Sequence, residues 1–268
     1  MKITILGSGT STGVPEYKCQ CDTCQDARVY GSKNYRSRTS IHVEITTSDN
    51  IKHLQFDVGP NFIDQIDRCQ IDRIDAVIYT HCHADHISGT NDLVMPCRKQ
   101  NTDMPIYGPT ETMSILQRNF DYMFRKDTFQ GGGVAHLVPN PVTGPFNLFG
   151  LNIVPIPVQH GTVDTFGYRI QNFGYIPDVK LMPSQSLELL KGVDLLIIDA
   201  LSFNPGHPTH FSVQDAIVIW EKIQPKNTYL IHMMHRIDHR YFNDQCSEQG
   251  FDLPESVRLS FDGQVLQL

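Results

Sequence analysis

The stretch "THCHADHISG", Thr80–Gly89, places three histidines and one aspartate within six positions, directly after the apolar run "IDAVIY". The length and the β-branched residues of that run are typical of a buried strand, so the polar side chains begin where the strand ends. Residues two positions apart on an extended segment point to the same side, which lets His81 and His83 face one metal ion. Asp85 and His86 follow as the chain turns, and they can face a second ion beside the first.

The alternative is a surface loop that carries these side chains without any ligand. At the end of a buried strand, however, four polar groups would lose contact with water without gaining a partner, which is costly in free energy. One H-x-H pair would be weak evidence, whereas H-x-H-x-D-H gathers four ligand-type side chains in one place. The pattern therefore favours a centre for two metal ions.

Further ligand-type side chains directly follow apolar runs elsewhere in the chain. His160 ends "IVPIPVQH", Asp178 follows "GYIP", and His232 follows "TYLI". Each alone is more often a structural histidine or a turn aspartate, but together with the first motif they complete a ligand set. Asp57 in "QFDVG" and Asp199 in "LLIIDAL" also lie at strand ends, and we expect both to hold ligand histidines in orientation.

The composition restricts the partners that this chain can have. Its hydrophobic share of 40% over 268 residues is ordinary for a globular protein with a sizeable core. The formal net charge of -7 argues against a general nucleic-acid binder, which shows a basic face, but it allows a small phosphorylated substrate held by metals. "MKITILGSGT" has too short an apolar run for a signal peptide, and no stretch approaches the ~20 apolar residues of a membrane span. We expect a cytoplasmic protein with no membrane attachment and no stable nucleic-acid partner.

Periodicity predicts alternating strands and helices without repeats or linkers. The expected strands are residues 2–6, 39–45, 53–58, 75–79, 105–108, 151–160, 165–170, 193–201 and 228–232, followed by a terminal hairpin of 257–261 with 264–268. The expected helices are residues 61–69, 109–124, 184–192 and 212–224. We predict one domain, residues 1–268, with two sheets and outer helices.

Three local signals refine this prediction. Pro155 and Pro157 mark the strand 151–160 as an edge strand, because proline cannot donate to a neighbouring strand. Ser212 and Asp215 predict a capping box at the start of the helix 212–224. "QGGGVAH", residues 130–136, is predicted to be a flexible surface loop.

Taken together, these motifs resemble the metallo-β-lactamase-fold hydrolases, and among them the phosphodiesterases of the carbon–phosphorus lyase pathway, which open phosphoribosyl cyclic phosphate. Three features carry the resemblance in order along nearly the whole chain: "CQCDTC" with Cys19, Cys21 and Cys24, then "THCHADHISG", then "HPTHFS" followed by His232 and His235. The resemblance implies a four-layer αββα metallo-β-lactamase sandwich, with the metals at strand ends between the two sheets.

The resemblance also implies which residues hold metals. One cation would be bound by His81, His83 and His160, a second by Asp85, His86 and His232, with Asp178 bridging the two. The two divalent cations could be Mn²⁺ or Zn²⁺, because histidine and aspartate suit both.

The seven cysteines include one close cluster, Cys19, Cys21 and Cys24. In a reducing compartment disulfides are not expected, so the cluster indicates a metal site. His235 completes a Cys3His set, which is typical of a closed, tetrahedral structural Zn²⁺ site. The alternative is a loop of unrelated thiols.

Two metals bridged by a carboxylate suit phosphate ester hydrolysis, because they lower the pKa of water and neutralise the phosphoryl oxygens. We expect Asp85 to orient the hydroxide. His210 is the candidate proton donor to the leaving oxygen, since histidine commonly fills this role near pH 7. The amides at the helix start near Ser212 would favour a phosphate oxygen.

Some alternatives stay open. The scaffold could instead cleave thioesters or process RNA 3′ ends, or it could serve as a non-catalytic zinc-bearing carrier. A homodimer is one option for the assembly. In "NYRSRTS", either Arg36 or Arg38 could contact the phosphate of a small phosphodiester substrate, or both could be solvated surface residues.

Overall fold

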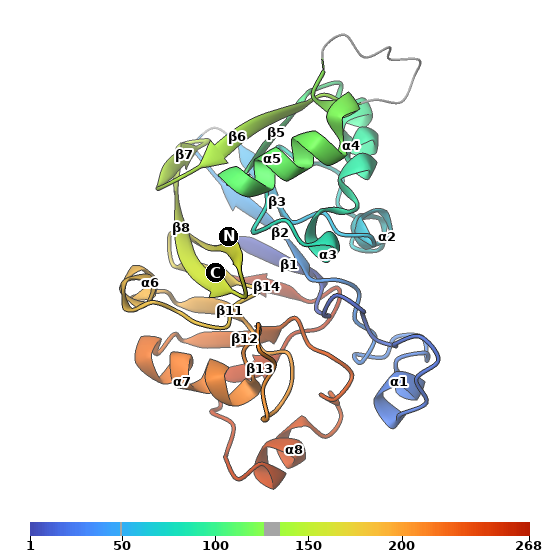
Figure 1. Ribbon diagram of the computed structural model, residues 1–268, viewed down its shortest axis with the longest axis vertical. Coiled ribbons are helices and arrows are strands. Elements are labelled where there is room, and N and C mark those ends of the chain that lie inside the picture. Colours follow the sequence, from blue (N-terminus) through green and yellow to red (C-terminus); the bar gives the residue numbers. More distant parts are fainter. Residues whose placement is uncertain (49, 126–134) are drawn as a thin grey trace.

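The computed structural model describes residues 1–48, 50–125 and 135–268, which form two facing sheets with helices outside them (Figure 1). The first sheet contains, in spatial order, β14 (Val265–Gln267), β1 (Lys2–Gly7), β2 (Ser40–Thr46), β3 (Ile51–Phe56), β4 (Ala76–Ile78), β5 (Met104–Pro109) and β6 (Leu137–Val142). The second contains β13 (Val257–Leu259), β12 (Asn227–Ile231), β11 (Leu195–Asp199), β10 (Phe173–Ile176), β9 (Val163–Ile170), β8 (Leu151–His160) and β7 (Phe146–Leu148).

Helices cover the outer face of each sheet. Those on the first sheet are α2 (Phe62–Arg68), α3 (Ala84–Ile87), α4 (Val94–Gln100) and α5 (Thr110–Asn119), with the 3-10 turns η1 (Thr90–Leu93) and η2 (Asp121–Met123). Those on the second are α6 (Ser184–Leu190), α7 (Val213–Ile223) and α8 (Phe242–Glu248). The short helix α1 (Asp22–Asp26) lies on an arm apart from both layers (Figure 1). Among the described residues, no helix is long and apolar enough to cross a membrane.

Three apolar cores lie between the four layers, which confirms the αββα sandwich. Phe56 and Ile197 belong to the core between the two sheets. Ile198, the next residue on β11, packs instead with Ile219 of α7. Successive side chains of a strand point to opposite faces, so a strand covered on both sides is apolar throughout. This explains the unbroken apolar run "LLII" that precedes Asp199 in β11.

The strand directions bring the candidate residues together. Strands β3, β4 and β5 are parallel in the first sheet, as are β10, β11 and β12 in the second. Strand β8 is antiparallel to β9, which is antiparallel to β10, so β8 runs in the same direction as β10. Because parallel strands end at the same edge of a sheet, the polar residues that follow them gather at that edge.

The predicted terminal hairpin is wrong. Strand β13 pairs in parallel with β12 in the second sheet, whereas β14 pairs antiparallel with β1 in the first. The turn between them carries the chain from one sheet to the other, and Asp262 in it accepts hydrogen bonds from the Ser8 and Ser37 amides, both at 2.8 Å. Apolar alternation identifies a strand but not its partner, and this explains the error.

The other local predictions agree more closely with the structure. Strand β8 carries Pro155 and Pro157 and was predicted to be an edge strand. Strand β7, which was not predicted, lies outside it but pairs only with Leu151–Ile153, so both prolines lie where β8 has no partner in β7. The capping box of Ser212 and Asp215 is present. The predicted helix 109–124 ends early, at Asn119, and continues as η2. Most of the predicted loop "QGGGVAH" lies outside the described residues.

Candidate metal centre

The first group of ligand-type atoms comes from the ends of β4, β8 and β10. His83 Nδ1 lies 2.9 Å from His81 Nε2 and 3.1 Å from His160 Nε2. Asp178 Oδ2 lies 3.8 Å from His81 Nε2 and 3.6 Å from His160 Nε2. A tetrahedral cation with bonds of about 2.0–2.2 Å separates its ligand atoms by about 3.3–3.6 Å. The observed separations bracket this value, so these four residues fit one cation.

The second group shares Asp178 with the first. Asp85 Oδ2 lies 3.4 Å from both His86 Nε2 and His232 Nε2. Asp178 Oδ1 lies 3.2 Å from His86 Nε2, and its Oδ2 lies 3.4 Å from His232 Nε2. Asp178 therefore contacts both groups, as a bridging carboxylate would. The structure thus brings together all seven residues expected around the two cations.

The electrostatics of this cluster also suit cations. Asp178 and His86 are almost completely buried, and Asp178 Oδ1 and His86 Nε2 lie 3.2 Å apart without forming a hydrogen bond to each other or to another described residue. Burial opposes ionisation of Asp178, but the imidazoles of His232, His86 and His81 hold its pKa well below the usual range. Buried polar atoms without partners are rare in proteins, and a shared cation would satisfy both.

The histidines are oriented by hydrogen bonds to their other ring nitrogens. Asp57 Oδ2 lies 2.8 Å from His86 Nδ1, as we expected of this aspartate. The Thr80 amide donates to Asp57 Oδ1 at 2.8 Å, which fixes the carboxylate. His160 Nδ1 donates to the Thr209 carbonyl at 2.7 Å. Such contacts select the nitrogen that faces a metal. Thr80 is the first residue of the "THCHADHISG" motif, but its support of Asp57 was not predicted. The contact of His160 with the Thr209 carbonyl could not be predicted, because a main-chain carbonyl leaves no signal in the sequence.

His210 lies against the metal-ligand cluster, held by Asp199. Its Nδ1 is 2.9 Å from Asp199 Oδ2, and its ring stacks on that of His232 with centroids 4.6 Å apart. Burial disfavours the charged imidazole, but the Asp199 carboxylate outweighs it and raises the pKa of His210 to about 9. Asp199 was expected to orient a metal ligand, and it orients His210 instead. Because Nδ1 is engaged, Nε2 is the nitrogen left for proton transfer.

The helix start near His210 does not offer the expected phosphate contact. The Ser212 amide donates to Asp215 Oδ2 at 2.9 Å, and the Asp215 amide donates to Ser212 Oγ at 3.1 Å. The Val213 amide donates to the Ser202 carbonyl. All three amides already have acceptors, two within the capping box and one in the Ser202 carbonyl. The expectation that they would bind a phosphate oxygen is therefore wrong.

The two arginines of "NYRSRTS" differ in how deeply they are buried and in what they contact. Arg36 is 1% exposed and donates to the Met234 carbonyl at 2.9 Å, so it is neither a surface residue nor placed to reach a substrate. Arg38 is partly exposed, and its Nε donates to the Ser11 carbonyl at 2.9 Å.

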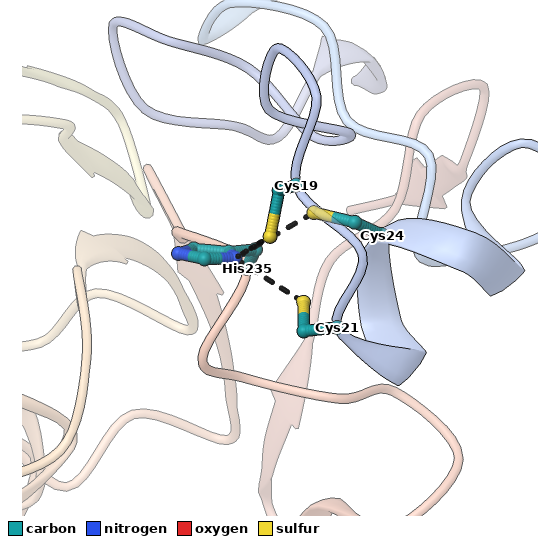
Figure 2. A group of neighbouring side chains, drawn as sticks. All are labelled: Cys19, Cys21, Cys24 and His235. Atoms are coloured by element: carbon teal, nitrogen blue, oxygen red, sulfur yellow. Dashed lines mark hydrogen bonds between the residues drawn. The ribbon is translucent and has the colours of Figure 1, made fainter.

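The Cys3His set forms where the three cysteines of the arm that carries α1 meet His235, which follows β12 (Figure 2). The Sγ atoms of Cys19 and Cys21 lie 3.3 Å from His235 Nδ1, and that of Cys24 lies 3.5 Å from it. A zinc ion with Zn–S bonds of about 2.3 Å and a Zn–N bond of about 2.0 Å would separate these atoms by about 3.5 Å. Glu16 Oε2, which we did not predict, lies 3.4 Å from His235 Nε2 and supports the ring from behind. The four residues therefore fit a closed zinc site.

We expect Cys21→Ser to lower the zinc content by about one ion per chain and to lower the melting temperature by several degrees, since ~1 kcal/mol shifts a chain of this size by about 2–4 °C. Zinc measured by mass spectrometry together with thermal unfolding tests this. Cys69→Ser, which changes a half-buried thiol outside the cluster, is the control. Unchanged zinc content and melting temperature in Cys21→Ser would show that the cluster holds no zinc.

Comparison with known proteins agrees with this geometry. Residues 54–233 match the model of the beta-lactamase superfamily domain. The chain therefore belongs to the β-lactamase superfamily, with the metallo-β-lactamase fold. Within it, the chain is similar to a solved diphosphatase from the PhnP family, with 33% identity and a TM-score of 0.85 over 100% of this chain and 97% of that one. These findings confirm the resemblance inferred from the sequence.

More distant solved structures share the fold alone. Zn²⁺-bound PqqB from Methylobacterium extorquens is 19% identical with a TM-score of 0.76, over 100% of both chains. The short form of human tRNase Z is 18% identical with a TM-score of 0.70, over 100% of this chain and 99% of that one.

The chain is also similar to a protein whose name indicates a different activity. An octanoyltransferase of Porphyromonas gingivalis is 31% identical over 263 residues, which is 98% of this chain but 51% of that protein. The chain thus spans about half the length of this relative.

Proposed function

We propose that this chain is a phosphodiesterase that hydrolyses small phosphodiesters, cyclic ribose or nucleotide phosphates among them, with two divalent cations, Mn²⁺ or Zn²⁺. The observation that carries the proposal is the pair of ligand groups that share Asp178 and lie beside His210. The similarity to a diphosphatase of the PhnP family supports phosphate chemistry. We also propose a cytoplasmic location and no stable nucleic-acid partner.

Each group of the site has a defined task under this proposal. Cations bound there would supply Lewis acidity toward the phosphoryl oxygens and lower the pKa of water. Asp85 Oδ2 lies between His86 and His232 and can accept a hydrogen bond from the attacking water, which orients it. His210 donates a proton from Nε2 to the leaving oxygen, while Asp199 holds the ring through Nδ1.

The proposal is tested by a screen of cyclic and linear phosphodiesters, including bis-p-nitrophenyl phosphate, on protein of measured metal content. We expect turnover that a chelator removes and that Mn²⁺ or Zn²⁺ restores. Protein that is fully loaded with metal and turns over none of the phosphodiesters would contradict the proposal. A non-catalytic carrier would also show no turnover, but it would hold only one ion per chain.

The octanoyltransferase relative favours a second candidate, hydrolysis of an acyl thioester. The same fold and cations could polarise a thioester carbonyl instead of a phosphoryl group. An octanoyl thioester is therefore included in the screen on the same preparation. Turnover of the thioester without turnover of phosphodiesters would replace the first candidate by the second.

A further inference from the structure

The two candidate metal centres are joined by one short segment, residues 232–235. His232 at its beginning belongs to the second group of the two-cation centre, and His235 at its end belongs to the Cys3His set. A displacement of this segment would therefore move one donor atom of each centre at the same time.

The segment begins in an uncommon backbone conformation. His232 has a φ of +62°, in the left-handed region that side chains other than glycine rarely adopt. A residue stays in this region only when its surroundings hold it there. The neighbouring backbone does so in part, because the Met233 amide donates to the Ser8 carbonyl at 3.0 Å and the Met234 amide donates to the Leu201 carbonyl at 3.0 Å.

Arg36 supplies the side-chain contact to the middle of the segment. Its guanidinium donates to the Met234 carbonyl at 2.9 Å. Its main chain forms a pair of hydrogen bonds with Val14, of 2.9 and 2.8 Å, just before the arm that carries Cys19, Cys21 and Cys24. One residue thus connects the base of the cysteine arm with the turn that bears both histidines.

The buried guanidinium of Arg36 has few hydrogen-bond acceptors around it. The side chain is 1% exposed, and burial lowers its pKa to about 10. Its guanidinium also donates to Asn34 Oδ1 at 3.3 Å, and within the described residues it forms no ion pair. The charges of Asp262 and Asp238 offset part of the cost of burying this cation, and the Met234 carbonyl is the nearer of its two hydrogen-bond acceptors.

We propose that Arg36 is a positioning residue that couples the two metal centres: by holding the Met234 carbonyl it sets both His232 and His235, so that occupancy of one centre strengthens binding at the other. The proposal rests on the metal binding in the proposed function and not on the substrate. Metal content is therefore its readout, and a failed substrate screen would leave it unaffected.

The experiment titrates metal-free Arg36→Met, Arg36→Lys and wild-type protein with Zn²⁺ and Co²⁺ at buffered free concentrations. The thiolate-to-cobalt absorption band reports metal binding at the Cys3His set. Total metal per chain, less the metal bound at that set, reports binding at the two-cation centre. We expect Arg36→Met to bind about 10–100-fold more weakly at the Cys3His set and at one of the two remaining sites, as for other residues that orient metal ligands. Arg36→Lys should recover part of this affinity.

Arg169→Met is the matched control. This partly buried arginine also donates to main-chain carbonyls, those of Leu189 and Lys191 at 2.7 and 2.8 Å, but to neither centre. It should lose stability without losing metal affinity. Wild-type metal affinity in Arg36→Met, or an equal loss in Arg169→Met, would overturn the proposal.

If Arg36→Met does not fold, reciprocity provides a second test. Coupling between two binding sites must act equally in both directions. Cys21→Ser should then weaken one site of the two-cation centre, and His232→Ala should weaken cobalt binding at the thiolates by the same factor. Independent binding in these two variants would likewise overturn the proposal.

Discussion

Replacing Asp178 with alanine is expected to lower kcat/KM for bis-p-nitrophenyl phosphate by about 10³-fold or more. Its two oxygens contact both ligand groups, because Oδ2 lies 3.6 Å from His160 Nε2 of the first group and Oδ1 lies 3.2 Å from His86 Nε2 of the second. Without this carboxylate, cations bound at the two groups would each lose a ligand. Cation stabilisation of a transition state is worth several kcal/mol, of which ~4 kcal/mol corresponds to about 10³-fold in rate. His81→Ala, which removes a donor of the first group, should have a similar effect.

The measurement pairs turnover with metal content and a melting curve on each preparation. Asp75→Asn is the matched control, because this partly buried aspartate pairs with Arg73 at 2.7 Å and touches neither metal group. It should keep its metals and its turnover. Wild-type turnover in Asp178→Ala with its metals retained would show that the bridged pair does not perform the chemistry.

Replacing His210 with alanine is expected to separate two kinds of substrate. A ribose oxygen is a poor leaving group that needs a proton, so turnover of a ribose phosphodiester should fall by about 10²–10⁴-fold. A nitrophenolate leaves without protonation, so turnover of the nitrophenyl ester should fall much less. His210 is placed for this task because Asp199 fixes its Nδ1 at 2.9 Å and its ring stacks on that of His232.

Both substrates and the bound metal are measured on one preparation of His210→Ala. His136→Ala serves as the control, because this histidine pairs with Asp103 at 3.2 Å and is not among the residues gathered at the metal groups. An equal loss on both substrates would indicate phosphate binding by His210, and a loss of metal would make it a ligand or a support. Either result would remove it from the role of proton donor.

The residues of the candidate site could be proposed from the sequence alone because their signals are local. "THCHADHISG" combines a strand end with four ligand-type side chains, and His160, Asp178 and His232 each directly follow an apolar run. Alternation along a strand and the spacing of a capping box depend on neighbouring residues, so they can be read without the fold. The strand-end rule then indicates where these side chains meet, and the structure brings them together.

Only the tertiary structure decided which distant groups pair. Strand β14 lies beside β1 rather than β13, the Thr209 carbonyl orients His160, and Arg36 is buried against Met234. These contacts join residues far apart in the chain, and they depend on which surfaces the two sheets bury against each other. A carbonyl is present on every residue and an arginine is usually exposed, so neither carries a local signal of its partner. The sequence by itself therefore determined which ligand-type side chains stand at each strand end, whereas long-range packing determined which groups hold those side chains in place.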